Sequence, residues 1–199
     1  MQCDVKQLQV ERGDKILLQG LSFSIKKGEC WQLIGENGVG KTSLLRLLAG
    51  LVEPLSGECQ VKNYLYLGHK QALKASLTVL EWLRFHPYLQ ASQKHMDIAL
   101  QQFQLAAIKD HLIQTLSQGQ KQRLHLMPLL CVEKTLWLLD EPFAGLDRDG
   151  VALLESIIDK KIAQGGAVLL TSHQRMNLQC SVQELLLTNY RVNEVLICD

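Results

Sequence analysis

The sequence predicts an α/β protein in which a parallel sheet carries an inserted lobe of helices. Three features of its 199 residues support this fold class. Short apolar runs such as 136–139 and 167–171 have the composition of buried parallel strands. Helical spacing separates them at 151–164, and a glutamine- and leucine-rich stretch from about 78 to 132 reads as several helices. Alternation of strand and helix favours a parallel sheet with crossover connections.

The first fifty residues indicate a small N-terminal antiparallel β subdomain followed by a strand and a helix. Residues 5–10 and 16–25 alternate as half-exposed strands do, and the Gly-Asp pair between them is typical of a hairpin turn. Residues 31–34 form a short apolar run that enters a glycine-rich turn, and residues 42–51 continue with helical spacing.

We expect a single domain over residues 1–199. Its core would comprise about 1–68 and 133–199, and the helical lobe about 69–132. The tail from Ser181 predicts two more short strands.

Bulk composition favours a soluble globular protein and argues against a nucleic-acid partner. Lys and Arg number 21 against 20 Asp and Glu, so no surplus positive charge is available to neutralise phosphates or anionic lipid. We expect no signal peptide, since the N-terminus is polar, and no membrane span, since the apolar runs stay far below about 18 residues. The scattered cysteines favour a reducing compartment.

A glycine-rich segment between the predicted strand 31–34 and the following helix carries the strongest chemical signal. It matches GxxxxGK[ST] in full. Glycines let backbone N–H groups converge on phosphate oxygens, the lysine supplies a full charge that also serves catalysis, and the threonine hydroxyl is placed for Mg²⁺. The pattern predicts a P-loop NTPase with a RecA-like core. Its expected nucleotide-binding residues are Gly35, Glu36, Asn37, Gly38, Val39, Gly40, Lys41, Thr42 and Ser43.

The predicted strand 136–139 ends in two adjacent carboxylates, Asp140 and Glu141. Since ligands bind at the carboxyl ends of parallel strands, both side chains should face the phosphate loop. Asp140 and Thr42 are expected to hold Mg²⁺. Glu141 is expected to act as general base for the water that attacks the γ-phosphate.

Three further motifs, in chain order, resemble those of the ABC ATPase family. Residues 116–120 (LSQGQ) resemble the LSGGQ signature, and Ser117 is also expected to be a helix N-cap that Gln120 completes as a capping box. Residues 146–147 resemble the D-loop, and residues 171–173 resemble the switch strand with its histidine. The resemblance covers essentially the whole chain, and five ordered motifs make it specific.

The resemblance implies a composite site for ATP and Mg²⁺, shared between two copies of the chain. Ser117, Gly119 and Gln120 would bind the γ-phosphate of ATP held by the second copy, so two nucleotides would be buried in a sandwich dimer. His173 would contact the γ-phosphate and order the attacking water, and Asp147 would join the nucleotide site. The resemblance also implies a transmembrane permease subunit as partner. The chain would then lie peripherally on the cytoplasmic face of the inner membrane.

The chain departs from the family pattern at three positions. Arg12 stands where an aromatic side chain usually stacks on adenine, and a guanidinium should select adenine less strictly. His69 occupies the place of the Q-loop glutamine and is therefore a further candidate to contact the metal and the γ-phosphate. Gln71, two residues later, is the alternative residue for this role. Pro128 replaces a helical arginine and should kink or end the helix.

These departures, the short single cassette and the YLGH and TSHQ segments resemble the ATP-binding subunits of heme exporters in cytochrome c maturation. Cytochrome c maturation proteins are therefore possible partners. The alternatives are an ATPase subunit of another small ABC exporter and a non-transport cytosolic ABC ATPase.

The family also suggests where the membrane subunit docks, in the cleft between core and lobe. We expect Leu80 and Leu83 to pack inside the lobe. Trp82 and Phe85 lie three residues apart on one helical face, so one or both are candidates to line the docking groove.

Overall fold

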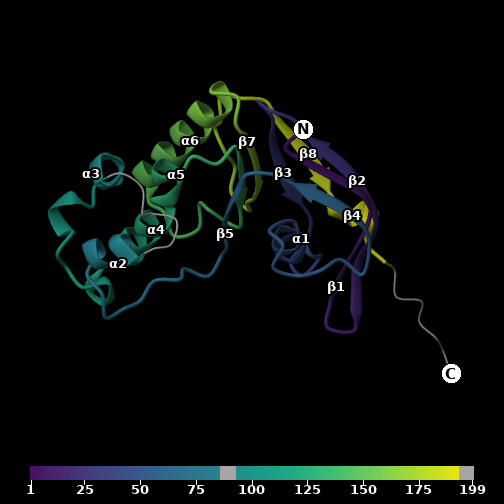
Figure 1. Cartoon of the computed structure of the whole chain (residues 1–199), viewed down its shortest axis with the longest axis horizontal. Coiled ribbons are helices and arrows are strands. Elements are labelled where there is room, and N and C mark those ends of the chain that lie inside the picture. Colours follow the sequence, from purple (N-terminus) through teal and green to yellow (C-terminus); the bar gives the residue numbers. More distant parts are fainter. Residues whose placement is uncertain (86–92, 193–199) are drawn as a thin grey trace.

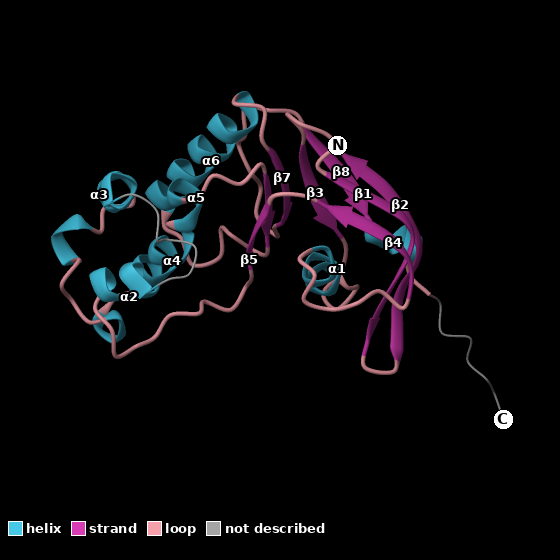
Figure 2. Cartoon of the chain, in the orientation of Figure 1, coloured by secondary structure: helices cyan, strands magenta, loops and turns pink. Residues whose placement is uncertain are grey.

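The computed structural model describes residues 1–85 and 93–192, and places two sheets on one side and a group of helices on the other (Figure 1). The larger sheet lies between the helices α4 to α6 and the smaller sheet, with α1 beneath the latter (Figure 2). The predicted fold class is therefore confirmed: an antiparallel unit, a parallel sheet and an inserted helical lobe.

Five parallel strands form the larger sheet, in the order β5-β6-β7-β3-β8. The strands β6 and β7 are buried along their whole length, which is why they read as uninterrupted apolar runs. The bounds are Cys30–Ile34 for β3, Tyr64–Leu67 for β5, Leu136–Leu139 for β6, Ala167–Thr171 for β7 and Val182–Leu186 for β8.

The smaller sheet is antiparallel and has the order β2-β1-β4, with β1 at Cys3–Arg12, β2 at Lys15–Ile25 and β4 at Ser56–Val61. The predicted hairpin is confirmed, and Gly13 takes a φ of 62° at its turn. The sequence analysis missed β4 and β5. Most of β4 is polar and exposed, and β5 has only four residues, so neither shows a long hydrophobic period.

Side chains that alternate along β6 separate two hydrophobic clusters, one on each face of the sheet. Leu136 and Leu138 belong to the cluster that includes α1 (Lys41–Leu48). Trp137 and Leu139 belong to the cluster that includes α6 (Arg148–Ala163) and the lobe. Because successive side chains of a strand point to opposite faces, one four-residue strand anchors both layers.

The lobe consists of short helices, as predicted. They are α2 (Val79–Phe85), α3 (Gln93–Gln102), α4 (Gln118–Leu126) and α5 (Pro128–Cys131), with 3₁₀ turns at Ala106–Ile108 and Ile113–Thr115.

Pro128 ends one lobe helix and begins the next, as expected. It is the first residue of α5, directly after Met127, and α4 stops at Leu126. A proline is tolerated at this first helical position because its missing N–H would have no intrahelical acceptor there.

One of the two strands predicted for the C-terminal tail is confirmed within the described residues. The strand β8 exists, but Leu187–Tyr190 continues as a 3₁₀ helix, and residues 193–199 lie outside the described part of the chain. Leu187, the first residue of this 3₁₀ helix, is buried in the cluster that includes α1 and the antiparallel sheet. In residues 1–85 and 93–192 no helix has the length and apolar character needed to cross a membrane.

Candidate active site

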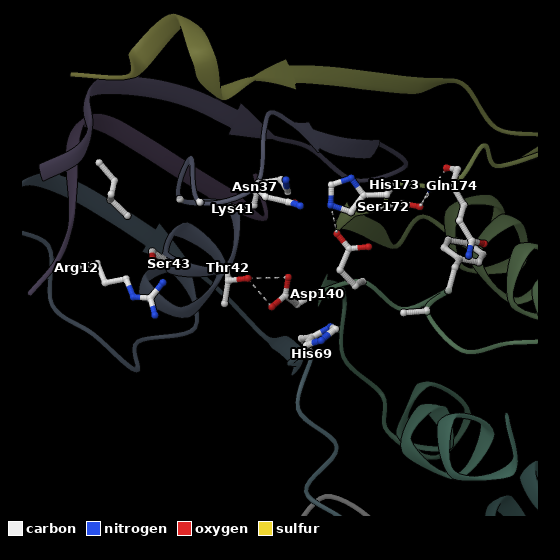
Figure 3. Close-up of a pocket in the computed structure, with 16 residues that line it drawn as sticks. Arg12, Asn37, Lys41, Thr42, Ser43, His69, Asp140, Ser172, His173 and Gln174 are labelled. Atoms are coloured by element: carbon white, nitrogen blue, oxygen red, sulfur yellow. Dashed lines mark hydrogen bonds and ion pairs between the residues drawn. The ribbon is translucent and has the colours of Figure 1, made fainter. Parts of the chain in front are cut away.

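A cavity of about 490 Å³ opens at the carboxyl ends of the central parallel strands. Loops that follow β3, β6 and β7 form its walls, and the end of the β1–β2 hairpin closes one side (Figure 3). Its lining residues are Arg12, Leu17, Asn37, Gly38, Gly40, Lys41, Thr42, Ser43, His69, Asp140, Glu141, Phe143, Ala144, Ser172, His173 and Gln174.

Most of the residues predicted from the sequence meet at this cavity. The other predicted residues do not line the cavity: Gly35, Glu36 and Val39 belong to the phosphate loop, and the remaining four, at the starts of α4 and α6, are Ser117, Gly119, Gln120 and Asp147. Five lining residues had no predicted role: Leu17, Phe143, Ala144, Ser172 and Gln174. Ser172 and Gln174 stand in the TSHQ segment, Phe143 and Ala144 closely follow Glu141, and Leu17 carries no motif signal.

The phosphate loop joins β3 to α1 and depends on glycine geometry. Gly38 and Gly40 take φ values of 85° and 118°, which side chains with a Cβ rarely adopt. No side chain caps the first turn of α1 within the described residues, so its backbone N–H groups face the loop as an anion site. The buried Lys41 ammonium donates to the carbonyls of Gly35 and Glu36 at 2.7 and 3.2 Å, which orients it along the loop.

Two threonine hydroxyls hold the buried carboxylate of Asp140. Thr42 Oγ1 donates to its Oδ2 at 2.9 Å, and Thr171 Oγ1 donates to its Oδ1 at 3.1 Å. Thr171 Oγ1 also accepts a hydrogen bond of 2.7 Å from the backbone N–H of Glu141. One hydroxyl on β7 therefore orients both acidic residues that follow β6. Thr171 lies in the predicted switch segment, but nothing in the sequence indicates this bridging role.

Glu141 sits on a constrained turn next to His173. Its φ of 52° lies in the left-handed region, which is uncommon for a residue with a side chain. Its Oε1 lies 3.3 Å from Nε2 of His173, a contact that a dashed line marks at the labelled His173 in Figure 3. His173 is 55% exposed and Glu141 19%, so the pair stands at the cavity mouth, where water can reach it.

Arg12 and His69 both line the cavity, at different places. Arg12 lies on the side of Ser43, and His69 lies beside Asp140 (Figure 3). Of the two alternatives for the Q-loop position, His69 therefore reaches the pocket. Gln71 instead donates to Gln122 of α4 at 2.5 Å and does not line the cavity.

The signature segment forms the predicted capping box at the start of α4. Ser117 Oγ accepts from the N–H of Gln120 at 3.2 Å, and the N–H of Ser117 donates to the Gln120 side chain at 2.8 Å. Ser117 is exposed, so the helix start faces outward from this copy of the chain.

Asp147 caps α6 and forms an ion pair with the signature helix. Its Oδ1 accepts from the N–H of Gly150 at 2.9 Å, and both carboxylate oxygens accept from Arg123 Nη2 at 2.7 and 2.9 Å. The hydrogen bond from Arg123, followed by that from Gly150, lowers the pKa of Asp147. The sequence analysis did not identify Arg123 as its partner.

The phosphate loop at the N-terminus of α1 and the acidic pair after β6, which β7 separates from β3 in the sheet, define a nucleoside triphosphatase. The chain matches the ABC transporter family over residues 18–144, more than half its length. It belongs to this family and is the ATP-hydrolysing domain of an ABC transporter.

Curated relatives align with nearly the full chain. The cytochrome c biogenesis ATP-binding export protein CcmA of Mannheimia succiniciproducens is 39% identical over 88% of this chain and 89% of its own length. The CcmA protein of Escherichia coli K12 is 38% identical over 94% of this chain and 97% of its own length.

Solved structures share the fold. A putative ABC transporter ATP-binding protein from Pyrococcus furiosus has a TM-score of 0.81 at 25% identity and covers 96% of this chain. The alignment covers 99% of that protein. A putative metal-chelate type ABC transporter in an inward-facing conformation has a TM-score of 0.78 at 25% identity, with 93% and 79% coverage.

Proposed function

We propose that this chain is the ATPase subunit of an ABC exporter in cytochrome c biogenesis, where it powers heme export or the release of a heme-loaded chaperone. The contact between Glu141 and His173 at the mouth of the phosphate-loop cavity is the observation that carries the hydrolytic role. The role in cytochrome c biogenesis is supported by the full-length similarity to the CcmA proteins.

The geometry supports in-line hydrolysis of the γ-phosphate by water. Backbone N–H groups of the phosphate loop and the Lys41 ammonium would bind the phosphates. Glu141 would accept a proton from the attacking water, and His173 would hold that water and the γ-phosphate in place. Since Glu141 is fixed through its backbone N–H by Thr171, its carboxylate is positioned before the substrate binds.

The residues present suit a magnesium ion. Asp140 is a buried carboxylate surrounded by hydroxyl groups, and oxygen donors of this kind are the ligands that Mg²⁺ prefers. Thr42 and Asp140 would hold the ion, which neutralises charge on the β- and γ-phosphates when bound. An imidazole is a poorer Mg²⁺ ligand than a carboxylate. The place of His69 beside Asp140 therefore supports a contact with the γ-phosphate, or with the ion through a water molecule, in place of direct coordination.

A second copy of the chain would complete the site. Ser117, Gly119 and Gln120 lie outside the cavity of their own copy, and Ser117 is exposed. In the sandwich dimer they would bind the ATP held by the other copy, with Asp147 nearby at the start of α6. Each protomer would act as a single ATPase domain, with the core at about 1–68 and 133–199 and the lobe at about 69–132.

A transmembrane permease subunit would convert this cycle into transport, with the chain bound peripherally at the cytoplasmic face of the inner membrane. Phe85 is 74% exposed at the end of α2, which suits a docking contact. Trp82 is not available for docking: it is buried, and its indole N–H donates to the carbonyl of Ala72 at 3.2 Å. Leu83 packs inside the lobe as expected, and Leu80 is half-buried.

The test is genetic complementation in the native host. Deletion of the gene should remove covalently bound heme from c-type cytochromes, detected by heme staining of membrane proteins. The wild-type chain should restore the signal and Lys41→Ala should not, at equal protein levels. Normal c-type cytochromes in the deletion strain would contradict the cytochrome c role and leave another ABC exporter as the alternative.

A further inference from the structure

Residues 68–78 form the linker between β5 and α2, and this linker carries His69. The signature helix α4 contacts it at one residue before His69 and at one residue after it. Nε2 of His125 lies 3.0 Å from the carbonyl oxygen of Gly68, immediately before His69. Two residues after His69, Gln71 Nε2 donates to Gln122 Oε1 at 2.5 Å. His69, which lines the nucleotide cavity, is therefore held between two side-chain contacts from one helix.

We propose that His125 is a positioning residue that, together with Gln122, ties this linker to α4 and thereby holds His69 at the nucleotide cavity. The inference rests on the proposed function, which it deepens by naming the residues that couple lobe to site. A carbonyl oxygen can only accept a hydrogen bond. Nε2 of His125 therefore carries the hydrogen and donates a hydrogen bond to the carbonyl oxygen of Gly68. His125 is half-buried, which strengthens this hydrogen bond relative to an exposed one.

Gln122 extends the same connection to the hydrolytic loop. This buried side chain accepts from Gln71 and donates through Nε2 to the carbonyl of Pro142 at 2.9 Å, directly after Glu141. Both ends of its amide are engaged, so a shift of α4 must move the linker and the loop together or break one of these bonds.

Ser117 lies at the start of the same helix, eight residues before His125, a separation of about 12 Å along an α-helix. Ser117 is the residue proposed to bind the ATP of the second copy. A helix moves as a unit. Binding of the second copy's ATP to Ser117 would therefore shift α4, and His125 and Gln122 would pass this shift to His69. The predicted consequence is an effect on turnover, with little effect on the affinity for ATP.

Two variants of similar size separate hydrogen bonding from packing. His125→Leu removes the donor, whereas His125→Gln keeps an N–H near the position of Nε2. In the complex with the transmembrane subunit, we expect His125→Leu to lower the stimulated kcat about fivefold, a loss typical of one hydrogen bond, with KM for ATP unchanged. His125→Gln should retain at least half of the wild-type kcat. Equal losses in both variants, or a raised KM with normal kcat, would overturn the proposal.

A double variant tests whether His125 acts through His69. If it does, His69→Ala combined with His125→Leu should be no slower than His69→Ala alone, because the second change has nothing left to position. Multiplicative losses would refute this route. Hydrogen exchange of the isolated full chain gives an independent measurement: His125→Leu should speed exchange of the amides at 69–71, and His125→Gln should not.

The two proposals fail in different ways. A wild-type complex whose ATPase activity does not respond to the membrane subunit contradicts the proposed transport function, whatever the exchange data show. A wild-type complex that responds normally while His125→Leu matches it in kcat and in exchange at 69–71 contradicts only the positioning role.

Discussion

The imidazole Nε2 of His173 lies 3.3 Å from the carboxylate oxygen Oε1 of Glu141. The two residues come from loops after different strands, β7 and β6, which are neighbours in the parallel sheet. In the proposed mechanism, their contact would place the general base beside the residue that orders the attacking water, at the mouth of one cavity.

Glu141→Gln should retain ATP binding and nearly abolish turnover. The substitution removes the base but leaves the phosphate loop intact, and loss of a general base typically lowers kcat by about 10² to 10⁴. ATP should then trap a dimer detectable by size-exclusion chromatography. Phosphate release close to the wild-type rate would exclude Glu141 as the base.

Lys41→Ala should weaken nucleotide binding itself. The ammonium is a full charge aimed along the phosphate loop, and loss of a charged hydrogen bond of about 1.5 to 3 kcal/mol corresponds to a Kd raised roughly 10- to 100-fold. Isothermal titration with ATP measures this directly. Lys70→Ala is a matched control outside the cavity lining, and an unchanged Kd in Lys41→Ala would contradict the phosphate-loop assignment.

Mixed protomers should reveal the composite site. Ser117→Arg blocks the signature face and Lys41→Ala blocks the phosphate loop, so each chain should be inactive alone. Combined, they rebuild one intact site per dimer and should recover part of the ATPase activity. If mixed dimers form, as shown by differently tagged chains, and no activity returns, the two sites are either not shared between copies or must both be intact.

Thr171→Val should impair catalysis through both acidic residues. The hydroxyl donates to Asp140 and accepts from the N–H of Glu141, so valine of similar shape removes the acceptor of the Glu141 N–H and one of the two hydroxyl donors to Asp140, at a cost of about 1 to 3 kcal/mol. We expect kcat to fall roughly tenfold and Tm to decrease. Thr171→Ser, which keeps the hydroxyl, should stay near wild type. Equal kcat in Thr171→Val and wild type would show that the bridge is dispensable.

Arg12→Tyr should tighten the binding of ATP. Arg12 is largely exposed at the end of β1 and lines the cavity. Its planar guanidinium can stack on a base, but less tightly than an aromatic ring. An aromatic ring stacked on a base contributes about 1 to 3 kcal/mol, so the KM for ATP should fall about fivefold or more. Steady-state kinetics with ATP and with GTP measure the gain, which should be similar for the two purine bases. An unchanged KM for ATP in the variant would remove Arg12 from the base site.

Local patterns explain why much of the fold was predictable. Residues 31–34 and 136–139 read as buried strands because both faces of the parallel sheet are covered, and their termini carry glycines or carboxylates. The capping box at Ser117 needs only neighbours within one turn. By contrast, β4 depends on pairing with β1, a long-range contact that no local period records.

The sequence by itself determined the phosphate loop, the acidic pair after β6 and the signature cap, since each is a short segment whose spacing carries its chemistry. Only the tertiary structure decided which long-range partners these groups have. It brought Thr171 between Asp140 and Glu141, turned His69 rather than Gln71 toward the cavity, and joined the lobe to that linker through His125. The reason is that sheet order and helix packing bring together residues 30 to 98 positions apart, and such distances leave no periodic trace in the chain.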